Sequence, residues 1–250
     1  MWKLYDALLD PIPGDIRVAE TFMGGHWIAV RAEDGGLGLA MRINSATVPA
    51  FPAGEYAGLS LKALGQAAKS WNFISAGYGV AAINAYYNRP ERAAALGIDL
   101  SCPSLANEAF RKYRDQIAGK KAAVIGHFPY LEALLGPVCE LSIIERKPRP
   151  GDYPDPACEY LLPEQDYVFI TGSALVNKTL PRLLQLCRGY AVLVGPSVPL
   201  APALFDFGAD DLSGFVALDP DRCLQAIAQD AAGRHFDAGT MVHFKAPGLS

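Results

Sequence analysis

The sequence predicts an α/β protein, in which a Rossmann-like parallel sheet follows a smaller N-terminal α+β unit. Short, wholly apolar, β-branched runs alternate with helical segments in the second half, which is typical of a parallel sheet covered on both faces. The first half has a strand meander followed by two helical stretches, which is typical of a small α+β unit. Hydrophobic residues make up 51% and charged residues 19% of the 250 residues, so we expect packed cores.

The N-terminal unit is predicted from β-like runs and two helices. Residues 16–43 contain IRVAETFMGGHWIAVRA and GLGLAMRI, which a DGG turn joins. The helix SLKALGQAAKSW has Ser60 as its expected N-cap, and the helix ISAGYGVAAINAYYN runs to Asn88, just before a proline. The mixed stretch 89–106 predicts a connector. We therefore place the first domain at residues 1–106.

The second domain, residues 107–250, is predicted from an alternation of strands and helices. The strand-like runs are KAAVIG (121–126), ELSIIE (140–145), DYVFITG (166–172), YAVLVG (190–195) and GFVALD (214–219). The helical segments are ANEAFRKYRDQIAG, PYLEALLG, LPRLLQLC and APALFDFG. This order predicts a Rossmann-like sheet. For the polar tail from Gly233, loose packing and docking on the body are both left open.

Net charge and the length of the apolar runs argue against two classes of partner. The formal net charge is −4 and the isoelectric point is near 5.6, whereas a nucleic-acid-binding domain carries a basic footprint. The one basic cluster, RKPR at residues 146–149, contains a proline and is typical of a solvated loop. No apolar run approaches the roughly 20 residues that a membrane-spanning helix needs. We expect neither a nucleic acid nor a membrane as partner.

Cysteine usage and the first residues indicate the compartment. The opening stretch MWKLYDALLDPIPGD lacks the basic lead, long apolar core and small-residue cleavage site of an export signal. The five cysteines are scattered and form no CxxC pair. The odd count and the missing signal favour reduced thiols in the cytoplasm. A structural zinc site of the cysteine type is therefore not expected.

Polar or flexible residues follow four of the predicted strands at the point where each strand ends. In an open parallel sheet, ligands bind beyond the carboxyl ends of the strands, where helix N-termini present free N–H groups. These strand ends are Gly126-His127-Phe128, Glu145-Arg146, Thr171-Gly172-Ser173 and Gly195-Pro196-Ser197. We expect all four to meet at one edge of the sheet and to line a ligand site.

The stretch VFITGSALVNKTLPRLL, residues 168–184, is the strand end richest in hydroxyls and amides. Thr179 lies just before a Leu-Pro pair, so helix capping is favoured over a ligand contact there. For Ser197, which precedes a proline by two positions, capping and ligand binding are equally good interpretations. Asn177 has no obvious capping role, and hydrogen bonds to a ligand or within its loop are both left open.

One amide stands inside an otherwise apolar helix of the N-terminal half. Gly77, Ala81, Asn84 and Asn88 fall roughly on one face of GYGVAAINAYYN, where small residues permit the approach of another backbone. A buried asparagine must be hydrogen-bonded. For Asn84, packing against the backbone of the neighbouring domain and contact with a ligand are equally good interpretations. Asn88 is expected at the helix end.

The position of Glu145 raises the question of a nucleotide. It lies 19 residues after Gly126, at the end of the second predicted strand, where a dinucleotide-binding enzyme keeps the acid for a ribose hydroxyl. The rest of that fingerprint is missing, because HFPY follows Gly126 in place of GxGxxG. There is also no P-loop and no GxSxG nucleophile elbow. NAD binding in the usual mode is not expected.

A metal site needs ligands that converge in space. The candidates are His127, Glu145 and the carboxylates of Asp152 and Asp155 in RPGDYPDPACEY. They are dispersed along the chain, so this motif is weak. For the two aspartates, an exposed acidic loop is the favoured interpretation.

Six segments, in this order, resemble the putative heavy-metal chelation family: GGHWIAV, GYGVAAINAYYN, AVIGHFPYLE, IIERKPRPGDYPD, VFITGSALVNKTL and LVGPSVPLAPALFDFGADDLSGFVALD. The resemblance covers nearly the whole chain. Members of the family pair an N-terminal domain like that of enolase with a C-terminal Rossmann-like domain. The resemblance implies that the two domains meet at a cleft built from these segments.

On that implication, one residue of the first domain, Asn84, faces a set from the second. The set is Gly126, His127, Phe128, Glu145, Thr171, Ser173, Asn177, Thr179 and Ser197. The chain has no dense cluster of cysteine and histidine for a soft metal. An oxygen-rich pocket suits a metal already held by a small organic carrier, or an anionic small molecule at the helix N-termini.

The leading hypothesis is a cytoplasmic two-domain protein whose interdomain cleft binds a metal ion or metal complex. His127 and Glu145 would face the metal. The organic part would be oriented by Thr171, Ser173, Asn177 and Ser197. The alternative is an enzyme, such as a transferase, that uses an adenosine-containing small molecule with Glu145 on its ribose. A scaffold without a small-molecule site ranks last, and catalysis, the identity of the metal or cofactor, and a homodimer stay open.

Overall fold

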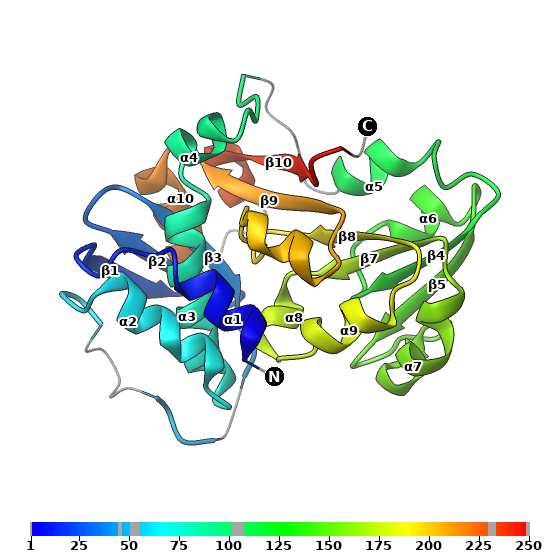
Figure 1. Ribbon diagram of the computed structural model, residues 1–250, viewed down its shortest axis with the longest axis horizontal. Coiled ribbons are helices and arrows are strands. Elements are labelled where there is room, and N and C mark those ends of the chain that lie inside the picture. The colour runs from blue at the N-terminus through cyan, green and yellow to red at the C-terminus, as the bar shows by residue number, and fades with distance from the viewer. Residues whose placement is uncertain (1, 45–46, 51–55, 102–107, 230–233, 249–250) are drawn as a thin grey trace.

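The computed structural model describes residues 2–44, 47–50, 56–101, 108–229 and 234–248. It has the mixed α/β fold that the sequence predicts, with a small antiparallel sheet of three strands and a mostly parallel sheet of seven. Figure 1 shows the small sheet with α2 and α3 on one side of the molecule and strands β4 and β5 on the other.

The elements have the following bounds in the described residues. The strands are β1 (Val18–Met23), β2 (Trp27–Ala32), β3 (Leu37–Met41), β4 (Lys121–Ile125), β5 (Glu140–Glu145), β6 (Tyr153–Pro154), β7 (Tyr167–Thr171), β8 (Tyr190–Val194), β9 (Asp211–Ala217) and β10 (Gly239–Lys245). The α-helices are α1 (Lys3–Leu9), α2 (Leu61–Gly65), α3 (Phe73–Tyr87), α4 (Pro90–Ala95), α5 (Glu108–Tyr113), α6 (Leu131–Leu135), α7 (Cys158–Leu161), α8 (Ser173–Val176), α9 (Leu180–Leu186) and α10 (Pro220–Ala228). The 3-10 helices are η1 (Gln66–Lys69), η2 (Asp155–Ala157), η3 (Leu162–Glu164), η4 (Pro202–Phe207) and η5 (Arg234–Ala238).

The small sheet is a meander in the order β1-β2-β3. The first predicted run divides into two strands, because the chain reverses between them and the Gly24 amide donates to the Trp27 carbonyl at 2.8 Å. Helix α3 packs on β2 and β3. A Cβ at Gly38 would lie 2.0 Å from the Ala81 carbonyl oxygen, so a glycine in this strand lets the helix approach closely.

The large sheet has the order β10-β9-β8-β7-β4-β5-β6. All neighbouring pairs are parallel except β9 and β10. The strand order reverses between β4 and β7, which is the switch point where Rossmann-like folds bind ligands. Two strands were not predicted: the short β6 and the antiparallel edge strand β10. The tail that was left open therefore docks on the body, since Gly239–Lys245 pairs with β9 along its whole length.

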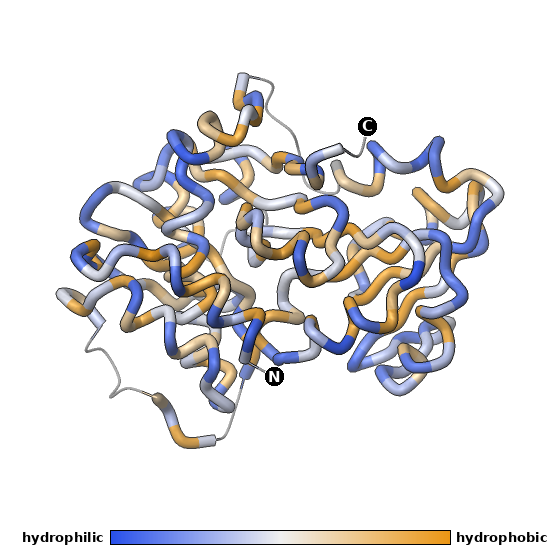
Figure 2. Tube along the Cα trace, in the orientation of Figure 1, coloured by the Kyte–Doolittle hydropathy of each residue, from blue (hydrophilic) through white to orange (hydrophobic). Residues whose placement is uncertain are grey.

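The hydrophobic core is continuous between the two sheets. Its largest cluster joins Ile28 and Ala81 of the N-terminal half to Val168 and Ile170 of strand β7. A second cluster lies under α5 and α6, and a third joins β3 to β9 and β10. Figure 2 shows the strands of the large sheet as hydrophobic segments inside the molecule and the outer loops as largely hydrophilic. No helix in the described part of the chain is long and apolar enough to cross a membrane.

Buried polar side chains fasten the two halves together. The Asn88 amide donates to the Val198 and Phe215 carbonyls at 2.9 and 3.1 Å, and its oxygen accepts from the Leu200 amide at 2.8 Å. The Tyr5 hydroxyl donates to the Leu175 carbonyl at 2.7 Å. Asn88 is the C-cap residue of α3, as expected, but its side chain also bridges to the second half. The predicted domain boundary between residues 106 and 107 lies outside the described residues.

Candidate functional site

The ends of strands β4 and β5 and the loop before β6 bring three predicted metal candidates together. Glu145, the last residue of β5, accepts the His127 amide at 3.0 Å through Oε2 and the Lys147 amide at 3.0 Å through Oε1. Both carboxylate oxygens of Glu145 are therefore used by the backbone. In this structure Glu145 shapes the two strand ends, and the His127 imidazole is the group that remains to meet a ligand.

The His127 imidazole lies between two carboxylates. Its Nδ1 lies 3.0 and 3.1 Å from the Asp152 oxygens, and its Nε2 lies 3.3 Å from Glu132 Oε1. The side chains of His127 and Asp152 are only 7% and 3% exposed, whereas that of Glu132 is 60% exposed. An ionised carboxylate only accepts hydrogen bonds, and Asp152 is the nearer of the two. The tautomer with its proton on Nδ1 therefore makes the shorter hydrogen bond and directs the lone pair of Nε2 toward Glu132.

Local backbone conformation places these carboxylates. Gly151 has φ of 102°, a conformation that favours glycine, and the turn it makes carries Asp152 back toward the sheet. The Asp152 carboxylate accepts the Arg149 amide at 2.9 Å, which closes this turn. Tyr130 has φ of 64° at the start of α6, which places Glu132 in the first turn of that helix. The loop around Asp152 is thus ordered by the same group that holds His127.

A hollow of about 310 Å³ lies beside this cluster. Its lining residues are Glu132, Gly136, Cys139, Leu141, Ile143, Pro150, Gly151 and Asp152. The Cys139 thiol donates to the Leu135 carbonyl at 3.3 Å, and burial raises the pKa of this thiol. A thiol is a metal ligand as its thiolate, so Cys139 is not prepared for that role.

The donor set around His127 suits a partly complexed metal better than a bare ion. No group of three or more His, Cys, Asp or Glu side chains within the described ranges is arranged to hold a metal ion. Asp152 and Glu145 are engaged by Nδ1 and by backbone amides. Among the described residues at this edge, His127 Nε2 and Glu132, 3.3 Å apart, are the donors that no backbone amide engages. A bare zinc ion takes four ligands, and this pair supplies two.

The polar residues at the end of β7 hydrogen-bond to one another. The hydroxyls of Thr171 and Ser173 lie 3.1 Å apart. The Asn177 oxygen accepts the Thr179 amide at 3.1 Å and the Thr179 hydroxyl at 2.6 Å. Helix capping by Thr179 is therefore wrong, since its side chain caps nothing in α9 and instead braces the loop. The loop-bracing interpretation of Asn177 accounts for these contacts.

Two other predicted residues lie at the junction between the halves. The Asn84 amide donates to the Leu39 carbonyl at 2.7 Å and to the Pro196 carbonyl at 3.3 Å. The Ser197 hydroxyl accepts the Met41 amide at 2.8 Å. Both side chains are buried, and the packing interpretation of Asn84 predicts this arrangement.

Gly126 and Phe128 flank His127 at the end of β4. Gly126 has φ of 100°, and a Cβ there would lie 3.3 Å from the Thr171 side chain across the switch point. The Phe128 ring packs edge-on against Phe110 of α5, with their centroids 5.0 Å apart. The two residues therefore form the turn and the apolar wall beside the imidazole.

Sequence reasoning missed Glu132 and Lys178. Glu132 had no signal beyond its place in the PYLE segment. Lys178 has φ of 69°, donates to the Val176 carbonyl at 2.8 Å, and has its amine 5.5 Å from the centre of the Phe73 ring. Burial lowers the pKa of Lys178 to about 8. The NK pair before a predicted helix was the only hint of this left-handed position.

A second histidine–aspartate pair lies far from this edge. Asp211 Oδ2, on β9, lies 2.8 Å from His243 Nδ1 on β10 and accepts the Tyr113 hydroxyl at 2.7 Å. Burial raises the pKa of Asp211, but the hydrogen bonds and charge of His243 outweigh this effect and hold the pKa below its usual value. Three buried atoms here have no hydrogen-bond partner among the described residues: Asp211 Oδ1, Ser213 Oγ and His243 Nε2.

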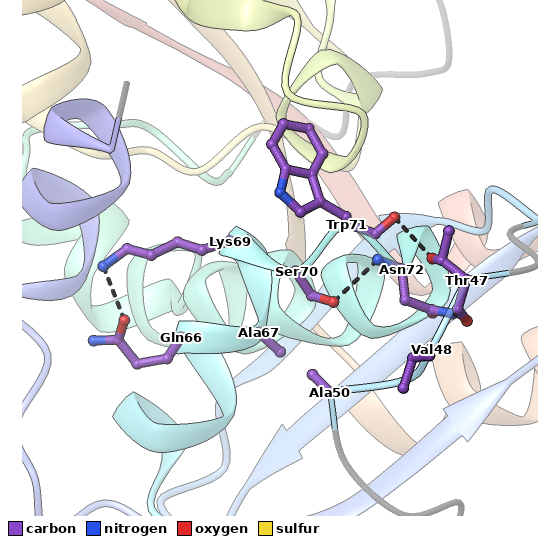
Figure 3. Close-up of a pocket in the computed structure, with 9 residues that line it drawn as sticks. All are labelled: Thr47, Val48, Ala50, Gln66, Ala67, Lys69, Ser70, Trp71 and Asn72. Atoms are coloured by element: carbon purple, nitrogen blue, oxygen red, sulfur yellow. Dashed lines mark hydrogen bonds between the residues drawn. The ribbon is translucent and has the colours of Figure 1, made fainter.

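A larger hollow, of about 560 Å³, lies in the N-terminal half between η1 and the loop at residues 47–50. Figure 3 shows the Trp71 ring directed away from Val48 and Ala50, while Lys69 bonds to Gln66. Lys69 is also paired with Asp6, its amine 2.5 Å from Oδ1. The described residues of this lining include no histidine, cysteine or carboxylate as a metal ligand. Each of these two hollows lies within one half of the molecule.

Comparison with known families decides the relationship of the chain. The model of the DUF364 family, described as "putative heavy-metal chelation", matches residues 108–246, which is more than half of the chain. This chain belongs to the DUF364 family. A second model, DUF4213, has the same description and matches residues 5–87. The resemblance found in the sequence is therefore confirmed.

Solved structures of DUF364 proteins share the fold. A protein of unknown function from Desulfitobacterium hafniense is 43% identical, with a TM-score of 0.90 over 98% of both chains. A DUF364 protein of unknown function from Pyrococcus horikoshii is 21% identical, with a TM-score of 0.75 over 97% of this chain and all of the other. An uncharacterised protein of Methanocaldococcus jannaschii is 35% identical over 169 residues, which span 63% of this chain and 60% of that protein.

Proposed function

We propose that the protein binds a metal complex, in which a small organic carrier supplies most of the metal ligands and His127 completes the coordination. One observation carries this proposal: a buried carboxylate, Asp152, holds His127 Nδ1 at 3.0 Å, and Nε2 faces the exposed Glu132 at 3.3 Å. Histidines that bind metals characteristically donate their other ring N–H to a carboxylate or carbonyl, which fixes the tautomer and raises the basicity of the ligand.

The chemistry of the donors selects the class of metal. An imidazole with a carboxylate suits zinc, nickel, iron or copper(II) better than a soft ion that prefers thiolates. Two protein donors leave room for a carrier that fills the remaining positions, which agrees with the family description of chelation.

The other candidate residues take supporting roles in this proposal. Glu145 positions the His127 backbone through its hydrogen bond of 3.0 Å and is removed from the metal. We do not assign the ligand to Thr171, Ser173, Asn177 or Ser197, because these side chains already bond within the protein. A cytoplasmic location stays a prediction.

The test is a thermal-shift titration of the untagged chain with the nickel complex of nitrilotriacetate, a carrier that leaves two adjacent coordination positions open. A ligand that binds only the folded state raises the melting temperature, and the shift grows with the logarithm of the ligand concentration above its dissociation constant. We expect a shift in the wild type, its loss in His127→Ala, and its retention in His26→Ala, which changes an exposed histidine. An equal shift in His127→Ala would show that the metal binds elsewhere.

One observation favours the second candidate, an enzyme that uses an adenosine-containing molecule. The strand order places Glu145 at the end of the strand beside β4, next to the Gly126 turn at the switch point. To bind a ribose, Glu145 would have to give up one of its two backbone hydrogen bonds. Adenosine monophosphate or S-adenosylmethionine, added with a chelator, would then shift the melting temperature, and nickel nitrilotriacetate would not.

A further inference from the structure

A basic loop lies directly beside the proposed site. Arg146, Lys147 and Arg149 follow strand β5, and their residues are exposed. The Arg146 side chain is used, since its Nε lies 2.6 Å from Asp155 Oδ2. Lys147 and Arg149 make no ion pair with any residue that the structure describes. Two unneutralised cations thus stand next to a cluster of carboxylates without pairing with it.

The same carboxylates that hold His127 also hold this loop. Glu145 accepts the amides of His127 and Lys147, both at 3.0 Å. Asp152 accepts the Arg149 amide at 2.9 Å and contacts His127 Nδ1 at 3.0 Å. Each basic residue is therefore linked to His127 through one shared carboxylate: Lys147 through Glu145, and Arg149 through Asp152. Pro148 and Pro150 restrict the backbone between and after Lys147 and Arg149. The backbone of these two residues therefore keeps a fixed position relative to the imidazole.

Hydrogen bonding explains why the cations stay unpaired. The carboxylate oxygens of Glu145 and Asp152 accept backbone amides of the loop itself, so these two side chains are directed toward the backbone. The Asp152 side chain is 3% exposed, which keeps it out of reach of solvent-facing ammonium or guanidinium groups. The outward face of the site thus carries two unpaired cations, Lys147 and Arg149, together with one exposed carboxylate, Glu132.

Resting on the proposed function, we infer that the organic carrier is anionic: a polycarboxylate or similarly charged chelate whose acidic groups meet Lys147 and Arg149 while its metal meets His127. Arginine pairs with a carboxylate through two parallel hydrogen bonds, and lysine adds a point charge. Charges within a Debye length of about 8 Å at physiological salt attract a ligand of opposite sign. A cationic or neutral carrier gains nothing from this loop.

The experiment compares two nickel complexes by calorimetric titration. Both nitrilotriacetate and tris(2-aminoethyl)amine leave two adjacent positions open on nickel, but the first complex is an anion and the second a cation. The variant is Lys147→Glu with Arg149→Glu. The matched control is Lys3→Glu with Arg17→Glu, which changes the net charge equally at exposed residues of the N-terminal half.

We expect the Lys147/Arg149 variant to bind nickel nitrilotriacetate about tenfold more weakly and the cationic complex no more weakly than the wild type, because exposed charge pairs contribute modestly. The control double variant should stay within about twofold for both complexes. Rising salt should weaken only the anionic complex.

Other outcomes separate this inference from the proposed function. Unchanged affinity for nickel nitrilotriacetate in the Lys147/Arg149 variant, or equal weakening of both complexes, would overturn the anionic carrier and leave the role of His127 intact. Failure of the wild type to bind either complex would overturn both. Binding of both complexes that survives His127→Ala would refute the proposed function itself.

Discussion

The molecule contains two histidine–aspartate pairs with the same contact and different surroundings. In both, a buried carboxylate lies close to Nδ1, at 3.0 Å for His127 and 2.8 Å for His243. His127 Nε2 meets Glu132, which is 60% exposed, whereas His243 Nε2 is buried without a partner in the described structure. The pair contact alone therefore does not indicate function. The neighbour of the second ring nitrogen differs between the two pairs: His127 Nε2 faces an exposed carboxylate, and His243 Nε2 does not.

The His243 pair fastens strand β10 and helix α5 to the sheet. Asp211 on β9 is fully buried and holds both His243 on β10 and Tyr113 on α5. The aromatic rings of Tyr167 and Tyr190 surround Tyr113, with centroids 6.0 and 5.6 Å away. No described hollow is lined by these residues. We therefore expect changes here to alter stability, and changes at the His127 pair to alter binding.

The largest expected effect is on stability, at the buried His243–Asp211 pair. Asp211→Ala leaves the Tyr113 hydroxyl and the His243 ring without their acceptor, and we expect the free energy of unfolding to fall by about 3 kcal/mol. Urea denaturation followed by circular dichroism measures this change. Asp206→Ala, at an exposed aspartate, should change stability by less than about 0.5 kcal/mol. If Asp211→Ala lowered the free energy of unfolding by less than about 1 kcal/mol, the distinction between the two pairs would be removed.

The next effect is at the His127–Asp152 pair. Asp152→Asn keeps the shape of the side chain but loses its charge, so we expect the affinity for nickel nitrilotriacetate to fall 10- to 100-fold, as for carboxylates that orient metal-binding histidines. Titration calorimetry measures the dissociation constant. Asp155→Asn, on the same loop but bonded to Arg146, should stay within about threefold. A wild-type affinity in Asp152→Asn would mean that Asp152 has only a structural role, like Asp211.

A third histidine, His235, has no carboxylate on its ring and provides a reference for both pairs. Its ring lies between Trp27 and Phe236, and burial lowers its pKa to about 4. The unfolded chain takes up this proton first as the pH falls, so stability is full above the ordinary pKa near 6.5 and decreases below it. We expect a loss of about 1–2 kcal/mol between pH 7 and pH 5. Chemical denaturation at a series of pH values measures it.

His235→Phe preserves the aromatic packing and removes the titrating group. We expect the stability of this variant to change little between pH 7 and pH 5, whereas His26→Ala should keep the wild-type dependence. A slope that persists in His235→Phe would show that the acid sensitivity does not come from His235.

The smallest effect concerns the polar end of β7. Thr179→Val removes a hydroxyl that donates to the Asn177 oxygen at 2.6 Å, and we expect a loss of about 1 kcal/mol in stability with unchanged affinity for nickel nitrilotriacetate. Thermal unfolding and titration of the same preparation measure both. A weaker affinity with unchanged stability would instead return Thr179 to the ligand site that the sequence predicts.

Much of the fold could be predicted because its signals are local. The Ser60 hydroxyl accepts the Ala63 amide at 3.3 Å, as its capping position predicts. The apolar runs from residue 121 onward form strands because each is buried on both faces of a parallel sheet. Strand β10 escaped prediction, because GTMVHFK is an edge strand with mixed polarity and needs β9 as a template. The split between β1 and β2 likewise depends on a turn that glycines permit without specifying.

The candidate site could be predicted only in part. The sequence places His127 and Glu145 at neighbouring strand ends, because parallel strands present their carboxyl ends at one edge. The sequence does not reveal which side-chain atoms already form hydrogen bonds within the protein. That Glu145 accepts two backbone amides, or that Asn177 braces Thr179, follows from the path of the loops in space.

The sequence by itself determined the α/β class, the family, and the strand edge at which polar side chains gather, because hydrophobic periodicity and residue order act over short distances. Only the tertiary structure decided that Asp152 orients His127 so that Nε2 faces Glu132. It also decided that the equivalent His243–Asp211 contact is buried beside Tyr113 of α5. Both pairs join residues at least 25 positions apart. Their environment depends on which side chains and helices cover them, and no local pattern records that.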